Sequence, residues 1–198
     1  MEKERDFDWE NTYSEKSVEE LGWYYPNLDP DLDFALSRLN IHSGTFLDLG
    51  TGPGTQAVEL SKKGFSVTGA DISENAVKKA TQLSDKVEFI RDDILNSKIT
   101  KKFKYIFDRG CYHVMSKSRR RDYVKAVKAL LEDGGILFLK CFSSKEADIK
   151  KGPYLSSSKT IHKVFDKDFS VQMIKDTFYQ GARETLPKAL FIVMQKIS

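Results

Sequence analysis

The stretch Phe46-Leu47-Asp48-Leu49-Gly50-Thr51-Gly52-Pro53-Gly54 decides the fold, because it predicts a buried strand that runs straight into a glycine-rich turn. Alternate glycines let the backbone come close to a ligand and adopt φ values that other residues resist. We expect a helix after this turn, with its free N–H groups directed at that ligand. The spacing is G-x-G-x-G, and Thr55 stands where a dinucleotide-binding turn has its third glycine. The stretch therefore predicts a cradle for a nucleoside or nucleotide and disfavours a nicotinamide cofactor.

Strands and helices alternate on both sides of this turn, with short links between them, which predicts an α/β fold with a parallel sheet. The last two apolar stretches, 170–179 and 189–196, predict a terminal antiparallel pair. The expected strands are 45–49, 65–70, 87–91, 104–108 and 136–142, and the expected helices include 55–63, a helix capped by Ser73, 118–132 and 158–165.

Residues 1–44 are expected to form a helical and aromatic cap segment ahead of a single compact domain at 45–198. Trp9, Tyr13 and Trp23 stand there among many charges. They predict either a lid over the site or rings that cover an edge of the core. Asp29-Pro30 opens a helix, because Asp caps a helix N-terminus and Pro fits its first turn.

The composition argues against several classes of function. The 198 residues carry a net charge of only +3, so no overall field favours nucleic acid or anionic lipid. No apolar run approaches the ~20 residues needed to cross a bilayer, and Met1–Glu10 is charged and acidic where a signal peptide is basic and then apolar. We therefore expect a cytoplasmic protein with no membrane partner. Cys111 and Cys141 lack zinc spacing and are too few for a disulfide framework, so we expect no metal.

Four successive predicted strands end at acidic residues, and in an open α/β sheet the ligand lies outside those carboxyl ends. The acids are Asp48, Asp71, the pair Asp92 and Asp93, and Asp108. Acids along one rim repel one another unless the ligand supplies hydrogen-bond donors or positive charge. A ligand with a phosphate group is therefore a poor fit for this acidic rim. S-adenosylmethionine suits the rim, because it carries an ammonium group, a ribose diol, an exocyclic amine and a sulfonium.

With these residues the chain, from Thr45 to its C-terminus, resembles the class I S-adenosylmethionine-dependent methyltransferases. The resemblance implies a Rossmann-like three-layer sandwich with a seven-stranded, mostly parallel sheet whose last strand is antiparallel. For the methionine part of the cofactor, it implies that Gly50, Thr51, Gly52 and Gly54 hold it, that Asp48 meets its ammonium, and that Asp108 and Arg109 pass beneath the sulfonium. For the nucleoside, it implies that Asp71 accepts both ribose hydroxyls and that Ile72 packs on the adenine. The adenine edge would be read by Asp93 and Ile94, or by Asp92 in another register. S-adenosylhomocysteine would be the product.

The run Phe107-Asp108-Arg109-Gly110-Cys111-Tyr112-His113, followed by Arg121-Asp122-Tyr123, is similar to a small-molecule branch of this family that includes thiopurine and tellurite methyltransferase-like proteins. The candidates for the substrate pocket are Trp9, Tyr13, Trp23, Cys111, Tyr112, His113 and Tyr154. His113 is the candidate base because it follows the fourth strand and has a pKa near neutrality; the alternative is an imidazole merely bonded to a loop carbonyl.

Several alternatives stay open. The acceptor could be RNA or a protein, or the chain could bind the cofactor without turnover. Arg119-Arg120-Arg121 could touch phosphates, but a solvated helix face explains three arginines more simply. Cys111 and Cys141 could line the same rim and bind a soft acceptor, or they could be two unrelated small apolar residues.

Overall fold

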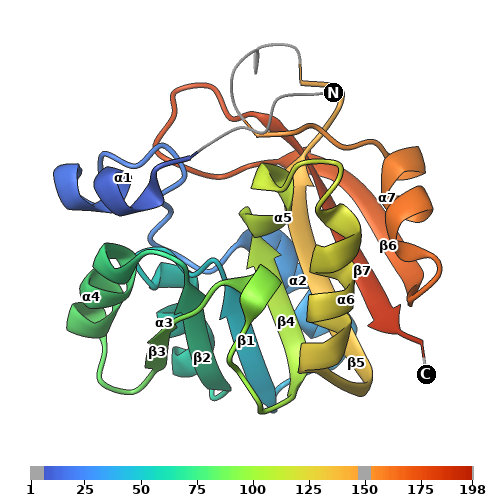
Figure 1. Ribbon diagram of the computed structural model, residues 1–198, viewed down its shortest axis with the longest axis horizontal. Helices are drawn as coiled ribbons and strands as arrows, with labels where there is room; N and C mark the ends of the chain where they lie inside the picture. The colour runs from blue at the N-terminus through green and yellow to red at the C-terminus, as the bar shows by residue number, and fades with distance from the viewer. Residues whose placement is uncertain (1–6, 147–152, 198) are drawn as a thin grey trace.

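A seven-stranded sheet forms the centre of the computed structural model, which describes residues 7–146 and 153–197 (Figure 1). Its strand order is β3-β2-β1-β4-β5-β7-β6. The strands are β1 (Thr45–Leu49), β2 (Ser66–Asp71), β3 (Glu88–Arg91), β4 (Phe103–Arg109), β5 (Leu131–Phe142), β6 (Phe169–Phe178) and β7 (Lys188–Lys196). The first five pair in parallel, and β7 pairs antiparallel with both β5 and β6. The predicted Rossmann-like sheet with an antiparallel last strand is therefore confirmed.

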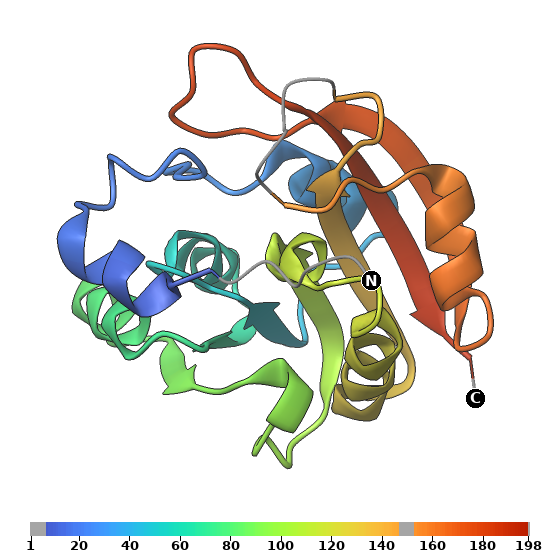
Figure 2. The same ribbon diagram turned by 45° about the horizontal axis from the view of Figure 1, so that its top comes forward.

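Helices cover both faces of the sheet, which gives the expected three layers (Figures 1 and 2). The helices are α1 (Trp9–Glu15), α2 (Pro30–Arg38), α3 (Thr55–Lys62), α4 (Glu74–Leu83), the 3₁₀ helix η1 (Ile94–Asn96), α5 (Cys111–Val114), α6 (Arg120–Leu130) and α7 (Ser158–Phe165). One core contains side chains of α6 and α7, and the other contains side chains of α2 and α3. Successive residues of one strand supply opposite cores, as Ile106 and Phe107 of β4 do, because side chains alternate across a strand.

Short polar side chains fix the helix starts that the sequence predicts. Asp29 accepts a hydrogen bond from the backbone N–H of Asp31 at 3.0 Å, ahead of Pro30. Ser73 accepts from Ala76 N at 3.1 Å, and Ser157 accepts from Thr160 N at 3.2 Å. These caps use helix donors that have no partner within the helix.

The boundary between α6 and β5 differs from the prediction. The helix ends at Leu130 and the strand begins at Leu131, whereas the sequence predicts a helix to 132 and a strand from 136. Leu131 pairs with Phe103 of β4, and the register then shifts before Ile136 pairs with Tyr105. The residues between them, with Gly134 at φ +72°, form the irregular part of the strand that the sequence assigns to a loop.

Candidate functional site

The glycine-rich turn lies at the carboxyl end of β1 and is anchored to the neighbouring strand. The N–H groups of Gly50 and Thr51 both donate to the carbonyl of Ala70, at 2.8 and 2.9 Å. Gly50 and Gly52 have φ values of +70° and +53°, which only glycine adopts without strain. A Cβ on Gly50 would lie 3.1 Å from the Cβ of Cys111, and one on Gly52 would lie 2.7 Å from the hydroxyl of Tyr13. The turn is thus a close-fitting cradle between α5 and α1.

Asp48 lies beneath this cradle and is almost fully buried. Its Oδ2 accepts a hydrogen bond of 2.6 Å from the hydroxyl of Thr51. Burial raises the pKa of the Asp48 carboxyl to about 7, and the Thr51 bond lowers it less than burial raises it. A nearby cation would favour the ionised form of such a carboxyl, so Asp48 suits an ammonium group.

Asp71 closes β2 and ties the cradle to the start of α4. Its carboxylate accepts from Gly52 N and from Ser73 N, both at 2.9 Å. Burial raises the pKa of Asp71. Its neighbour Ile72 is 48% exposed, so its side chain is open to a ligand at this edge.

The two acids after β3 make local bonds. Asp93 accepts from Leu95 N and from the side-chain amide of Asn96, at 3.0 and 2.7 Å, and so starts η1. Asp92 accepts from Lys98 N at 2.7 Å. Ile94 is only 4% exposed and packs in the core on the α6 side, so its side chain does not face a ligand in this structure.

Asp108 is completely buried and holds the loop that follows β4. It accepts from the N–H groups of Gly110, Cys111 and Tyr112, at 2.8 to 2.9 Å, and from the hydroxyl of Tyr123 at 2.5 Å. Burial raises the pKa of Asp108 to about 6. Because four donors already use its oxygens, Asp108 positions the loop and has little capacity left for a ligand.

Arg109 joins three distant segments next to the cradle. Its Nε donates to Asp29 at 2.9 Å, and its two Nη groups donate to the carbonyls of Trp23 and Gln180, at 3.0 and 2.5 Å. The guanidinium also lies 4.5 Å from the centre of the Tyr179 ring. Arg109 thus holds the N-terminal segment over the carboxyl ends of the strands.

A buried ion cluster behind Arg109 was not predicted from the sequence. Lys140 of β5 is fully buried, and its ammonium donates to both oxygens of Asp29, to Asp31 and to Gln180, at 2.5 to 2.9 Å. The sequence does carry one sign of this cluster: a lysine stands inside the apolar run 136–142, and a charge in a central strand needs a partner.

The helix α1 packs against the cradle and α4. Glu10 accepts from the Ser73 hydroxyl at 2.7 Å, and Lys79 donates to the Lys16 carbonyl at 2.7 Å. Tyr13 is only 4% exposed. The structure thus brings together three predicted pocket residues: the Trp23 ring lies 5.7 Å from that of Trp9 and 6.2 Å from that of Tyr13, in edge-on geometry. Figure 1 shows α1 above the N-terminal end of α4.

His113 lies inside an aromatic stack. Its ring is 4.6 Å from that of Phe142 and 5.7 Å from that of Tyr179. Burial lowers the pKa of His113 to about 3, so this imidazole is neutral and only weakly basic near neutral pH. This environment does not favour His113 as a general base, and a base role stays a prediction.

The other predicted pocket residues are more enclosed than expected. Tyr112 is fully buried between Tyr123 and Phe165, and Tyr154 is 4% exposed with its N–H donating to the His113 carbonyl at 2.6 Å. Cys111 lies half-buried against Gly50.

Cys141, by contrast, is fully buried in the core, and burial raises the pKa of its thiol to about 12. The interpretation of both thiols as neighbours lining one rim is therefore wrong for Cys141.

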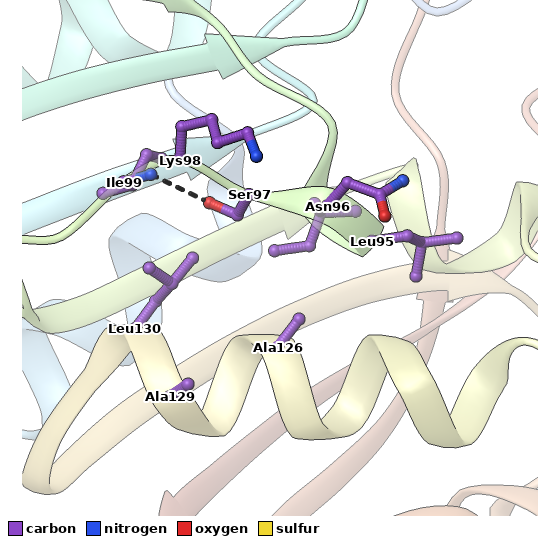
Figure 3. Close-up of a pocket in the computed structure, with 9 residues that line it drawn as sticks. Leu95, Asn96, Ser97, Lys98, Ile99, Ala126, Ala129 and Leu130 are labelled. Carbon is purple, nitrogen blue, oxygen red and sulfur yellow. Dashed lines mark hydrogen bonds between the residues drawn. The ribbon is translucent and has the colours of Figure 1, made fainter.

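Two hollows lie near these residues. The wider one, of about 390 Å³, lies between η1 and α6 and is lined mainly by 94–99, Ala126, Ala129 and Leu130 (Figure 3). None of the rim acids lines this hollow, so its residues do not make it the chemical site. The narrower one lies directly on the cradle, with Asp48, Thr51, Gln56, Trp23 and Arg109 among its lining residues.

Comparison with known proteins agrees with this geometry. Residues 46–135 match the family model described as a methyltransferase domain. EEF1A lysine methyltransferase 2 of Mus musculus is 31% identical over 116 residues, which are 52% of this chain and 48% of that protein. An uncharacterized methyltransferase of Schizosaccharomyces pombe is 29% identical over 102 residues, 49% of this chain and 70% of that protein. The chain spans about half the length of the first of these relatives.

Solved structures share the fold at low sequence identity. A structure from work on the conversion of a disulfide bond into a thioacetal group during echinomycin biosynthesis has a TM-score of 0.81 at 20% identity and covers 95% of this chain and 90% of that one. The N-methyltransferase NodS of Bradyrhizobium japonicum, in complex with S-adenosylhomocysteine, has a TM-score of 0.75 at 14% identity over 97% of this chain and all of that one. TehB of Haemophilus influenzae has a TM-score of 0.72 at 17% identity, and the match covers 96% of this chain and 67% of the TehB chain.

Two searches of the described residues found nothing. No helix within 7–146 and 153–197 has the length and apolar character to cross a bilayer. In the same ranges, no three His, Cys, Asp or Glu side chains are grouped so that they could hold a metal ion.

Proposed function

We propose that this chain, which carries a class I S-adenosylmethionine-dependent methyltransferase domain, transfers the methyl group of S-adenosylmethionine to a small molecule. The family resemblance drawn from the strand-end acids and the glycine turn is confirmed by the matched domain. The kind of acceptor and a cytoplasmic location are parts of this proposal.

The residues around the cradle fit the cofactor. Glycines at 50 and 52 let the turn take positive φ values beside Cys111 and Tyr13, and leave its backbone free of side chains of its own where the cofactor would lie. Asp48 would hold the ammonium group, and Asp71 would accept the ribose hydroxyls. When bound, the cofactor supplies a methyl group on a positively charged sulfur.

The chain's own residues position the acceptor and exclude water. Asp108 fixes Gly110 and Cys111 through their N–H groups, and Arg109 holds the Trp23 segment over the rim. Alignment and exclusion of water are the main contributions an enzyme makes to methyl transfer from a sulfonium. Because His113 is weakly basic and Asp108 is saturated with donors, the acceptor should be one whose attacking atom is already unprotonated.

The enclosed state of the rim is the observation that carries the choice of a small molecule. Tyr13 is buried against Gly52, and Trp9 and Trp23 pack around it. Such an aromatic cover suits an enclosed acceptor, whereas a polymer needs an open groove. NodS, named as an N-methyltransferase, and TehB share this fold, although at their low identity the likeness concerns the fold alone.

A protein acceptor is the second candidate, because EEF1A lysine methyltransferase 2 is 31% identical over about half of the chain. The remaining alternatives are methyl transfer to RNA and binding of the cofactor without catalysis.

Calorimetry tests the cofactor first, with S-adenosylmethionine, S-adenosylhomocysteine and NAD as titrants. Tight binding of NAD with no response to the two sulfur compounds would overturn the proposal. Transfer of labelled methyl groups is then measured with thiol, amine, carboxylate and metalloid acceptors, and in parallel with a cell protein extract and total RNA. Labelling of protein or RNA alone would refute a small acceptor, and no labelling of any acceptor despite cofactor binding would favour a binding protein.

A further inference from the structure

Arg120 is a buried cation that has no counterion in the part of the chain that the structure describes. It is the first residue of α6 and is only 2% exposed. Its Nε and one of its terminal nitrogens, Nη2, are enclosed and have no hydrogen-bond acceptor. Within residues 7–146 and 153–197, no ion pair joins Arg120 to a carboxylate. An isolated buried charge costs several kcal/mol, so proteins normally pair it.

Lys140 shows how the same chain treats a buried cation that belongs to the structure alone. Its ammonium meets two carboxylates and a side-chain amide, and all its donors have partners. Arg119 and Arg121, which flank Arg120, are partly exposed and each lie next to an aspartate, at 3.5 and 2.8 Å, although the Nε of Arg119 is also enclosed without a hydrogen bond. Arg120 therefore differs both from the buried lysine and from its own neighbours.

Two enclosed hydroxyls, those of Tyr112 and Ser156, belong to the same buried region as Arg120. Its guanidinium lies 4.6 Å from the centre of the Tyr112 ring, and the enclosed Tyr112 hydroxyl has no hydrogen-bond partner. The hydroxyl of Ser156, a residue with no exposed surface, lies close to the Tyr112 hydroxyl and the Cys141 thiol, without a well-oriented hydrogen bond to either. The charge of Arg120 also acts on the Cys141 thiol, which lies beside Ser156, and on His113. The two guanidinium nitrogens and the two hydroxyls meet no carboxylate within the described residues, and such a set of donors suits an anionic group.

We propose that Arg120, Tyr112 and Ser156 form a buried subsite for an anionic group, and that this group belongs to the methyl acceptor. The second part rests on the proposed function. Tyr112 directly follows Cys111, which lies against Gly50 of the cradle, so the short helix α5 joins the subsite to the cofactor site. An anionic acceptor also agrees with the weak basicity of His113.

The test measures thermal unfolding of the cofactor-free protein during titration with sodium acetate, sulfate or phosphate, with acetamide as the neutral control. A ligand that binds the folded state raises Tm in a saturable way. We expect a saturable rise with at least one oxyanion and none with acetamide. Arg120→Met should weaken this binding at least tenfold, whereas Arg119→Met, a matched change on the same helix, should keep it within twofold.

Stability without added anion separates a binding arginine from a structural one. Arg120→Met removes an uncompensated charge and keeps the volume, so its Tm without anion should equal or exceed that of the unmodified protein. If that variant does not fold, Ser156→Ala and Tyr112→Phe each remove one donor and should weaken anion binding several-fold.

The inference is overturned if no oxyanion gives a saturable rise, or if Arg120→Met and Arg119→Met respond alike. The source of the anion is decided by methyl transfer. If acceptors with a carboxylate or thiolate turn over faster than their neutral analogues, and Arg120→Met removes that preference, the acceptor supplies the anion; an unchanged preference refutes this part. Binding of an oxyanion without binding of S-adenosylhomocysteine would refute the proposed function and leave the subsite intact.

Discussion

Replacement of Asp71 by alanine should lower both the stability of the protein and its affinity for the cofactor. The carboxylate accepts two hydrogen bonds of 2.9 Å, from Gly52 N and Ser73 N, and is 7% exposed. Alanine leaves both donors without an acceptor in a buried place, and each such donor costs about 1–3 kcal/mol. The variant also no longer buries a carboxylate, which recovers part of this cost. We therefore expect the free energy of unfolding to fall by about 2–4 kcal/mol and Tm to fall by on the order of 10 °C.

Asp71→Asn separates the ribose role from the structural one. Its amide oxygen keeps one of the two acceptors, so the stability loss should be smaller than in the alanine variant. Its affinity for S-adenosylhomocysteine, measured by calorimetry below the Tm of the variant, should still fall at least tenfold, or about 1.4 kcal/mol, because the second acceptor for the ribose diol is gone. Asp85→Asn makes the same change at an exposed site and should alter neither quantity. Unchanged affinity in folded Asp71→Asn would refute the ribose assignment, and an unchanged Tm in Asp71→Ala would refute the cradle bonds.

Substitutions at four further positions test the aromatic cover, the ion cluster and the two titrating groups Asp48 and His113. Tyr13→Ala should open the cover and raise the dissociation rate of S-adenosylhomocysteine several-fold in stopped-flow measurements, with Tyr13→Phe close to the unmodified protein, since the ring provides the packing against Trp23. Lys140→Met removes the cation that Asp29 and Asp31 share and leaves them only Arg109 and Lys175, so it should lower the unfolding free energy by up to about 3–5 kcal/mol in denaturant titrations; no loss would mean that Lys140 contributes nothing to stability. Because the pKa of Asp48 is raised to about 7, the affinity for the cationic cofactor should rise with pH through this value, and Asp48→Asn should lose that dependence. The same raised pKa means that between about pH 4 and pH 7 the folded protein holds a proton that the unfolded chain has lost. The free energy of unfolding should therefore fall as the pH rises over this range. Because the pKa of His113 is lowered to about 3, the rate profile between about pH 5 and pH 8 should keep its shape in His113→Asn, and a lost inflection there would restore His113 as the base.

The candidate site shows where prediction from sequence stops. The acids at the strand ends are predictable, because a residue's place at the end of a strand follows from the local pattern. Whether those acids are free to bind a ligand is not predictable. Asp108 and Asp71 occupy corresponding places at the ends of β4 and β2, yet Asp108 receives four donors, one of them from Tyr123 of the packed helix α6, while Asp71 receives two from the cradle and the start of α4.

The pKa of a side chain is equally a property of its surroundings. His113 was the candidate base because a free imidazole titrates near neutrality. The stack with Phe142 and Tyr179, which come from β5 and from the segment after β6, removes the water that would stabilise its charged form. Nothing in the residues beside His113 in the chain indicates this.

By itself, the sequence determined the α/β alternation, the glycine turn at Gly50, the caps at Asp29 and Ser73, and the likeness to a methyltransferase family, because period, turn and capping signals act over a few residues. The tertiary structure alone decided that Tyr13 closes the cradle, that Lys140 meets Asp29 across 111 residues of chain, and that Arg120 is buried over the Tyr112 ring with no carboxylate beside it among the described residues. These facts depend on which distant segments exclude water from a side chain and which offer it a hydrogen bond, and neither is encoded in the local pattern.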